Sequence, residues 1–382
     1  MTTTFEPQTE QHWSPPQRAS WWAGVWTIAS IELRQRVRGV AAYVLLGVFA
    51  FILLLVTIGA ALAVGAWADG SEGAGGAVYA IVMVVTLLLA TLVSPALSGN
   101  AINGDREEGT LATTQVTLIT ATQLVLGKVL AAWITTLAFA VVAVPFILYT
   151  VILGGLSPST LVVSFLIIVI EMGVIAAAGV GLSGILRKPL MSVVVTYLIV
   201  AALSIGTLIA FAIVGASVRS HYTYVSESAD WARVDRDERA GLDPYQADRV
   251  PKPEYCTEVY SYESDVPRFD TVWWVLAANP YVILSDAVPT TYDRYGSPND
   301  VFGFIKLGIR QAQITPQLEE HYSDCDPNRY ESSEPRNIIE TTVPSWFVGL
   351  ALHIAGAGLL VWGAITRVRA PARRLGAGQR IA

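Results

Sequence analysis

Long apolar segments separated by short polar linkers occupy most of the chain. Six of them are long enough to cross a bilayer as helices, because about 20 apolar residues span its hydrocarbon core. They run approximately over residues 40–65, 77–101, 129–153, 160–186, 190–215 and 344–366. The composition agrees, since 53% of the residues are hydrophobic and 15% are charged, whereas about a quarter of a soluble domain is charged. We therefore predict an all-α polytopic membrane protein with six transmembrane helices.

Basic residues beside the predicted helices indicate their orientation. Six crossings place both termini on one side of the membrane. Three basic clusters fall on that side, and they comprise Arg34, Arg36 and Arg38, Arg187 and Lys188, and Arg367, Arg369, Arg373 and Arg374. Since Arg and Lys concentrate in short cytoplasmic flanks, we expect both termini to be cytoplasmic. Residues 1–20 then form a disordered cytoplasmic tail, and residues 367–382 form a basic one.

Residues 21–39 precede the first predicted crossing and are too polar to span a membrane. Trp21, Trp22 and Trp26 lie near the beginning of this segment, and three arginines lie near its end. Aromatic and apolar residues at helical spacing beside basic residues are typical of a helix in the headgroup plane. We expect an interfacial helix here, and the alternative is a charged flank of the first crossing.

A polar segment, residues 216–343, separates the fifth and sixth predicted helices and is expected to form an extracytoplasmic domain. It contains 22 Asp and Glu residues against 12 Arg and Lys residues, a net formal charge of −10. Within it, residues 272–289 are apolar again, but they are short for a crossing and are interrupted by Asn279-Pro280. A full crossing would move the C-terminal arginines outside, so we predict a re-entrant or interfacial helical pair.

Both cysteines of the chain, Cys256 and Cys325, lie in this polar segment. Disulfides form and persist in oxidising compartments outside the cytoplasm, so we predict a bridge between them. The alternative is two free thiols too far apart to bond, because spacing along the chain does not give the geometry.

The polar segment is also rich in tyrosine. The residues concerned are Tyr222, Tyr224, Tyr245, Tyr255, Tyr260 and Tyr262. Tyrosine rings can stack on a ligand, but such residues more often build the core of a small domain. We expect a core.

The linker between the second and third predicted helices has the sequence "NGDREEGTLATTQVTLITATQLVLGK" (103–128). Four charged residues are followed by Gly109 and by Thr110, which can cap a helix. An apolar side then comes from Leu111, Val116, Leu118 and Ile119. This pattern predicts a short amphipathic helix over about residues 105–120, with charges suited to docking on another protein. The alternative is a solvated turn that only caps a crossing.

The run Asp105-Arg106-Glu107-Glu108-Gly109-Thr110-Leu111, followed by Gly127-Lys128, resembles the pattern of ABC-2-type transporter permeases. In these membrane subunits of ABC exporters, a Glu-Arg-Glu-x-Gly-Thr-Leu run follows the second crossing, so Asp105 departs from the usual Glu. The segment from Glu32 to Arg38 resembles the family's interfacial connecting helix, and Asn279 to Tyr281 resembles its Asn-Pro step. Most of residues 216–343 lies outside the resemblance.

The resemblance implies that the segment around 107–120 is a coupling helix, which a nucleotide-binding subunit holds. The residues expected to take part in this coupling are Arg106, Glu107, Glu108, Gly109, Thr110 and Leu111. An alternative role for Arg106 is an ion pair with the acids of the connecting helix.

The resemblance also implies partners. The chain has no G-x-x-x-x-G-K-[ST] motif, so we expect it to be no enzyme and to bind no cofactor. Two separate ABC ATPase subunits would bind ATP and Mg²⁺, and a second permease copy or a homologous permease would complete an export path in a bacterial plasma membrane. The alternative function is transmission of ATPase motion to an extracytoplasmic protein, without transport. The formal charge of −6 argues against a nucleic-acid partner.

Two polar residues are expected at membrane depth, Glu171 in the fourth crossing and His353 in the sixth. A carboxylate in lipid is costly and needs a partner, a cavity or water. Glu171 either contacts a substrate or a proton, or is a protonated or hydrogen-bonded group that locks two helices, and His353 is a possible partner. Glycines on the same helix favour close packing, and they are Gly173, Gly179, Gly181 and Gly184. The histidines fit no zinc motif, so we predict no metal site.

Overall fold

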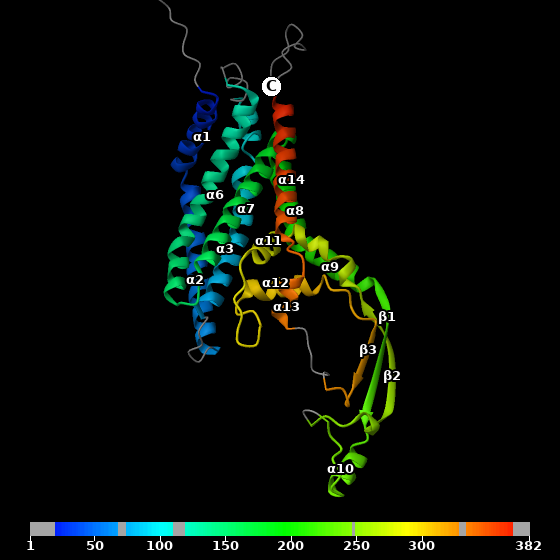
Figure 1. Ribbon diagram of the computed structural model, residues 1–382. Coiled ribbons are helices and arrows are strands. Elements are labelled where there is room, and N and C mark those ends of the chain that lie inside the picture. Colours follow the sequence, from blue (N-terminus) through cyan, green and yellow to red (C-terminus); the bar gives the residue numbers. More distant parts are fainter. Residues whose placement is uncertain (1–19, 68–73, 110–118, 247–248, 328–333, 370–382) are drawn as a thin grey trace, which may run out of the picture.

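The computed structural model describes residues 20–67, 74–109, 119–246, 249–327 and 334–369. Within these ranges, six helices are long and apolar enough to cross a membrane, and they form a bundle (Figure 1). They are α2 (Val40–Trp67), α3 (Ala74–Ser98), α6 (Ala121–Ile152), α7 (Pro158–Ile185), the continuous helix of α8 (Pro189–Ala201), η1 (Ala202–Gly206) and α9 (Thr207–Ser217), and α14 (Trp346–Val368). The chain is therefore a membrane-spanning protein, as predicted, and its orientation stays a prediction.

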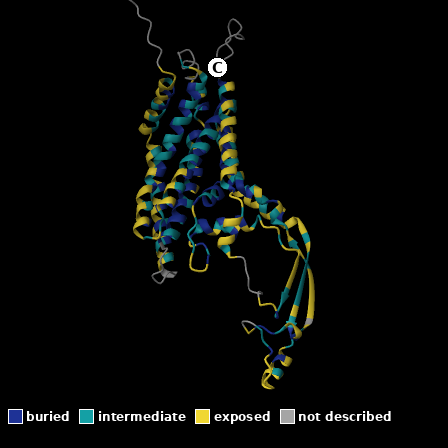
Figure 2. Ribbon diagram, viewed as in Figure 1, coloured by how far each residue is buried: buried dark blue, intermediate teal, exposed yellow. Residues whose placement is uncertain are grey.

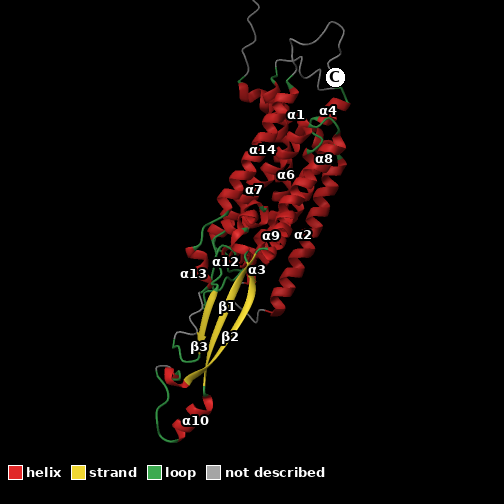
Figure 3. Cartoon of the chain, turned by 90° about the vertical axis from the view of Figure 1, so that its right-hand side faces the viewer, coloured by secondary structure: helices red, strands yellow, loops and turns green. Residues whose placement is uncertain are grey.

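The two ends of the bundle differ in what they carry. One end holds α1 (Trp21–Arg38), the short helix α4 (Asn103–Glu107) and the C-terminal end of α14 (Figures 1 and 3). We call it the α1 end. The opposite end, from which a β-sheet projects, is called the sheet end.

Glycines of α7 let the neighbouring helices approach closely. A Cβ atom added at Gly181 or Gly184 would overlap residues of α14, and one added at Gly179 would overlap Ser98 of α3. Small residues permit such close approach of helix backbones within a membrane. The predicted packing role of these glycines is confirmed.

Helix α1 packs along α6, as the buried side chains of Val25, Ile28 and Ala29 show. Gly127 of α6 allows this contact, because a Cβ atom there would overlap Ile28. Gly39, with an extended backbone, ends α1 before α2 begins. The predicted helix is confirmed, and its place in the headgroup plane stays a prediction.

The apolar segment 272–289 forms two short helices, η5 (Trp273–Ala278) and α11 (Pro280–Ala287). Asn279 separates them, and its side-chain oxygen accepts hydrogen bonds from the first N–H groups of α11. Its amide nitrogen donates to the carbonyl of Ser204, 2.7 Å away in the π-turn η1. The π-helical turn interrupts the regular hydrogen bonding of the helix and leaves the Ser204 carbonyl able to accept from Asn279. This hydrogen bond joins the fifth crossing helix to α11. The predicted helical pair is confirmed, and its depth in the membrane stays a prediction.

Helices α11 and α12 (Val301–Gln311) pack against the crossing helices α3 and α7. The shared cluster includes Tyr79, Met83, Leu87, Ile168, Met172, Ile283, Leu284 and Phe302. Helix α13 (Pro335–Thr341) lies next to α12 and leads into α14. Helices α11 and α12 of the polar segment are therefore built into the bundle.

The polar segment also contains a sheet, which the all-α prediction did not include, and its third strand follows α12 in the chain. Strand β1 (Arg219–Ala229) pairs antiparallel with β2 (Cys256–Pro267) and parallel with β3 (Glu319–Ser323). In the sequences "HYTYVSES" and "TEVYSYES", tyrosines recur at every second residue, which is the period of a strand, and Thr and Val, which favour strands, lie beside them. The sheet projects away from the helices, with α10 (Trp231–Arg239) at its far end and the short helices η3 (Pro253–Tyr255) and η4 (Phe269–Thr271) flanking β2 (Figures 1 and 3).

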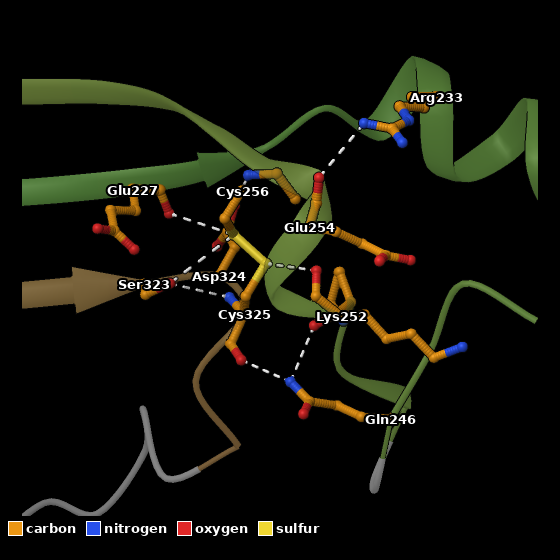
Figure 4. Close-up of a disulfide and its surroundings, with 11 residues drawn as sticks. Glu227, Arg233, Gln246, Lys252, Glu254, Cys256, Ser323, Asp324 and Cys325 are labelled. Carbon is orange, nitrogen blue, oxygen red and sulfur yellow. Dashed lines mark hydrogen bonds between the residues drawn. A yellow bond between two sulfur atoms is a disulfide. The ribbon is translucent and has the colours of Figure 1, made fainter.

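A disulfide joins Cys256, at the beginning of β2, to Cys325, two residues after β3 (Figure 4). The predicted bridge is confirmed. It ties β2 to the residues that follow β3, two strands that both pair with β1, and its two cysteines lie 69 residues apart along the chain.

Several tyrosines expected in a core lie instead on one face of the sheet. Strand register pairs Tyr224 with Tyr262 and Ser226 with Tyr260, and paired residues share a face. This tyrosine face carries Tyr222, Tyr224, Tyr260, Tyr262 and Tyr322. Tyr260 is 64% exposed and Tyr262 is 49% exposed, and Figure 2 colours parts of the sheet as exposed. The core prediction holds for Tyr255, which is buried, and is wrong for these two, because no second layer of described residues covers them.

Candidate functional site

The predicted coupling segment begins with a helix that is held firmly against α7. The hydroxyl of Ser183 in α7 accepts hydrogen bonds from the backbone N–H groups of Ile102 and Asn103, each at 3.0 Å. These two residues begin α4. Displacement of α4 would therefore displace the end of α7.

Arg106 strengthens the same attachment. Its guanidinium donates to the carbonyls of Gly184 at 2.9 Å and Leu186 at 3.1 Å, and to Asn103 Oδ1 at 2.8 Å. The last carbonyls of a helix lack partners within that helix, so Arg106 caps the end of α7. The alternative in which Arg106 pairs with acids of the connecting helix is wrong.

The acid of the connecting helix, Glu32, pairs instead with Lys128. The Lys128 ammonium group contacts the carboxylate of Glu32 in α1 and lies 2.9 Å from Asp105 Oδ2 in α4. The Lys128 side chain is 2% exposed, and a buried charge requires such partners. Glu32, Asp105 and Lys128 form what we call the charged joint, which connects α1, α4 and α6. The sequence signal for it is a single Lys at the entry of an apolar helix, and this Lys belongs to the Gly127-Lys128 step of the resemblance.

The acids that follow Arg106 face the surface. Glu107, Glu108 and Gly109 are exposed, and Gly109 has a φ of +70°, a backbone conformation that favours glycine. The predicted coupling residues Thr110 and Leu111 lie outside the described residues, as does most of the predicted amphipathic helix. The run of charges thus has one half, Asp105 and Arg106, bonded to the bundle and half-buried, and the other half, Glu107 and Glu108, exposed.

Glu171 and His353 are in contact inside the bundle. His353 Nδ1 lies 3.0 Å from Glu171 Oε2, and Glu171 is fully buried. His353 Nε2 lies 2.9 Å from the carbonyl oxygen of Ala278. A carbonyl only accepts hydrogen bonds, so Nε2 carries a hydrogen. Nδ1 and the Glu171 carboxyl then share one proton, either as imidazolium and carboxylate or as neutral imidazole and carboxylic acid, and both forms are neutral overall.

The pair joins three elements, since Glu171 belongs to α7, His353 to α14 and Ala278 to η5. A small pocket opens beside it, and its wall is apolar except for the pair and the hydroxyl groups of Thr91, Thr196 and Ser204. This arrangement supports the interpretation that Glu171 locks helices together. A role in contacting a substrate or a proton stays a prediction.

A second buried ion pair lies at the sheet end. Arg310 Nε in α12 donates to Asp286 Oδ1 in α11 at 2.8 Å, and the two side chains are 4% and 0% exposed. The other oxygen of Asp286 accepts from the backbone N–H groups of Ser345 at 2.6 Å and Trp346 at 3.1 Å. Asp286 therefore fixes α12 and the beginning of α14 to α11. The pairing of Asp286 with Arg310 was not predicted, because the polar segment contains many charged residues that could pair.

Burial shifts two ionisable groups near this pair. It lowers the pKa of Lys306 to about 8, and the Lys306 ammonium group donates to the carbonyl of Val288 at 2.5 Å. It also raises the pKa of Asp300, which caps α12. Both shifts reflect the cost of a charge in a poorly solvated place.

The described residues contain no group of three or more His, Cys, Asp or Glu side chains that could hold a metal ion. Two candidate sites are the surface acids beside the charged joint and the Glu171–His353 pair. In comparisons with known proteins, no family model matches the chain and no curated protein matches it in sequence.

Proposed function

We propose that the chain is the permease subunit of an ATP-driven ABC exporter in a bacterial plasma membrane. Two copies, or one copy and a homologous permease, form the translocation path. Two separate ATPase subunits bind ATP and Mg²⁺ and supply the energy. The resemblance of residues 105–111 to the ABC-2 permease pattern suggests the family, and the contacts of these residues support the mechanism.

The observation that carries the proposal is that one half of the charged run, residues 105–108, is bonded to the bundle and the other half is exposed. Asp105 and Arg106 bond to α6 and to the end of α7, whereas Glu107 and Glu108 are exposed. A subunit bound to the exposed acids would pull on α4. The pull would reach α7 through Arg106, and α1 and α6 through the charged joint. Small displacements of this kind are converted into larger ones where packed helices have two stable arrangements.

Charge reversal of the exposed acids tests this proposal. The affinity-tagged wild-type chain, purified from its own cells, should bring the ATPase subunits with it. The Glu107→Lys/Glu108→Lys variant should lose them, because surface charges orient docking and like charges repel. The matched control reverses two exposed acids at the far end of the sheet, Asp235→Lys/Glu238→Lys, and should retain the ATPase. Equal retention of the ATPase by the first variant would contradict the docking assignment, provided that thermal unfolding shows both variants folded.

A second candidate function is favoured by the attachment of the sheet. Only Val218 separates the end of α9 from β1, and the Arg268 N–H group after β2 donates back to the Val218 carbonyl at 2.8 Å. The fifth crossing helix therefore continues directly into the sheet. An ABC-type membrane subunit with this connection would transmit ATPase motion to an extracytoplasmic protein bound on the tyrosine face, without transporting cargo.

A structure of the complex with its ATPase subunits separates the two functions. Export requires a path between the two permease copies that opens to one side of the membrane. Transmission requires a sealed interface between the copies and a shift of the sheet between nucleotide states.

A further inference from the structure

A pocket lies at the corner where α1 meets α2, and α3 and α6 form its remaining walls. Its volume is about 180 Å³, and its lining is mostly apolar, with Leu33, Val37, Ala42, Leu46, Ile134 and Phe139 among the contributing residues. A cavity of about 150 Å³ lined by such side chains stays dry and binds small hydrocarbons. The pocket therefore favours a hydrocarbon occupant over water.

Arg36 brings a positive charge to this apolar pocket. Its Nη1 atom is buried and has no hydrogen-bond partner within the described ranges. The carboxylate beside it is that of Glu32, whose Oε2 lies 4.0 Å from Arg36 Nε, while the other Glu32 oxygen contacts Lys128. Burial lowers the pKa of Arg36, but a guanidinium keeps its proton at neutral pH. The Arg36 side chain is 17% exposed, so a ligand can approach it, and its unused buried donor lacks an acceptor.

We propose that this site binds one anionic phospholipid from the leaflet at the α1 end. The headgroup phosphate accepts a hydrogen bond from Arg36 Nη1, and one acyl chain fills the apolar pocket between α2 and α6. A phosphate suits this position because the planar donors of a guanidinium match phosphate oxygens. Arg34 and Arg38 on the same helix are exposed, and basic residues at a membrane surface attract anionic headgroups.

The site adjoins the charged joint, because Glu32 lies between Arg36 and Lys128. A phosphate bound to Arg36 replaces the distant contact with Glu32 and leaves that carboxylate to Lys128. Lipid binding is thus expected to tighten the joint between α1 and α6. This inference rests on the membrane-spanning character of the chain and does not depend on the proposed export function.

Native mass spectrometry of the purified full-length chain tests the site. The chain is released from detergent in the presence of phosphatidylglycerol and phosphatidylcholine with the same acyl chains. We expect preferential retention of one phosphatidylglycerol by the wild type and a retention about tenfold weaker in Arg36→Gln, since one charge-assisted hydrogen bond is lost. The matched control is Arg34→Gln, an exposed arginine of the same helix, which should lose much less.

A second variant tests the pocket separately from the charge. Ala42→Trp fills the apolar part while Arg36 remains, and it should also weaken lipid retention. Inorganic phosphate should not displace the lipid, because it lacks the acyl chain. The proposal is overturned if Arg36→Gln retains phosphatidylglycerol as the wild type does, if Arg34→Gln loses it equally, or if inorganic phosphate displaces it. Should Arg36→Gln fail to give a monodisperse protein, undiminished retention by Ala42→Trp overturns the proposal on its own.

Discussion

Each end of the bundle holds a buried basic side chain against carboxylates, but the two ends differ in their access to water. At the sheet end, Arg310 and Asp286 are 4% and 0% exposed. At the α1 end, Lys128 is 2% exposed, whereas its partners Glu32 and Asp105 are 16% and 25% exposed. The sheet-end pair is sealed, and the charged joint is open on its carboxylate side.

This difference in access to water indicates at which end the ion-pair contacts can change. Removal of one partner from a sealed pair leaves the other charge buried, with neither a counter-ion nor water. This is costly, so the contacts at the sheet end are held in one arrangement. Where the carboxylates touch water, a lost contact is partly replaced by hydration and costs less. The α1 end can therefore change its contacts when the segment after α4 is displaced, while the sheet end keeps α11, α12 and α14 together.

Asp286→Asn should cause the largest loss of stability, because it leaves the Arg310 charge without its counter-charge in a sealed place. Loss of one partner of such a pair costs about 3–5 kcal/mol. Thermal unfolding in detergent measures the loss. The control is Glu340→Gln, which breaks the exposed pair of Arg336 and Glu340 and should cost about 0–1 kcal/mol. Similar shifts in both variants would show that the Asp286 pair is not sealed.

Cys256→Ser/Cys325→Ser should destabilise the sheet by about 2–4 kcal/mol, since the bridge closes a long loop. The effect should stay local, because the bridge touches no crossing helix. Hydrogen exchange in β1 and β2 should become faster, whereas exchange in α7 and α14 should not change. Faster exchange throughout the bundle would mean that the sheet is part of the same cooperative unit.

A rise in pH should stabilise α12 through Lys306. Burial lowers the pKa of Lys306 to about 8 from an ordinary value of 10.5. Between these values the unfolded state binds more protons than the folded state, so stability rises with pH, by at most about 3 kcal/mol. Below the lower value both states are protonated and the slope vanishes. Hydrogen exchange in α12, corrected for intrinsic rates, measures the slope, and Lys306→Met should abolish it. An unchanged slope in that variant would assign it to another group.

Lys128→Met should have the smallest effect, about 1–3 kcal/mol, because the remaining carboxylates of Glu32 and Asp105 reach water. The loss should appear first as faster hydrogen exchange in α1, which the joint connects to α6. The conservative variant Lys128→Arg keeps the charge and serves as the comparison. Undiminished protection of α1 in Lys128→Met would show that apolar packing holds this helix without the joint.

The apolar segments predicted the six crossings, because membrane thickness sets their length, and the compartment predicted the disulfide. The contact of Glu171 with His353 was predictable because two polar residues at similar depth in lipid need partners. The sheet was missed because its tyrosines, which recur at every second residue, lie in a strongly polar segment. The high polarity of that segment hid the two-residue period that is typical of a strand. Arg106 was expected among the coupling residues or, alternatively, in an ion pair with acids of the connecting helix. Its carbonyl partners were not predicted, because the carbonyls at the end of a helix are neutral acceptors that charge patterns do not show. The Lys128–Glu32 pair crosses 96 residues of sequence, and many other pairings of charges were equally consistent with the chain.

The proposed function depends on a separate ATPase subunit that binds the surface acids at the α1 end. A photo-activatable cross-linking residue placed at position 107 in intact cells tests this binding, with position 243 beyond α10 as the control. We expect one covalent product at position 107, in which mass spectrometry identifies a protein carrying a G-x-x-x-x-G-K-[ST] motif, and no such product at position 243. The absence of any ATPase from the products at position 107, or the same product at both positions, would contradict the proposed binding.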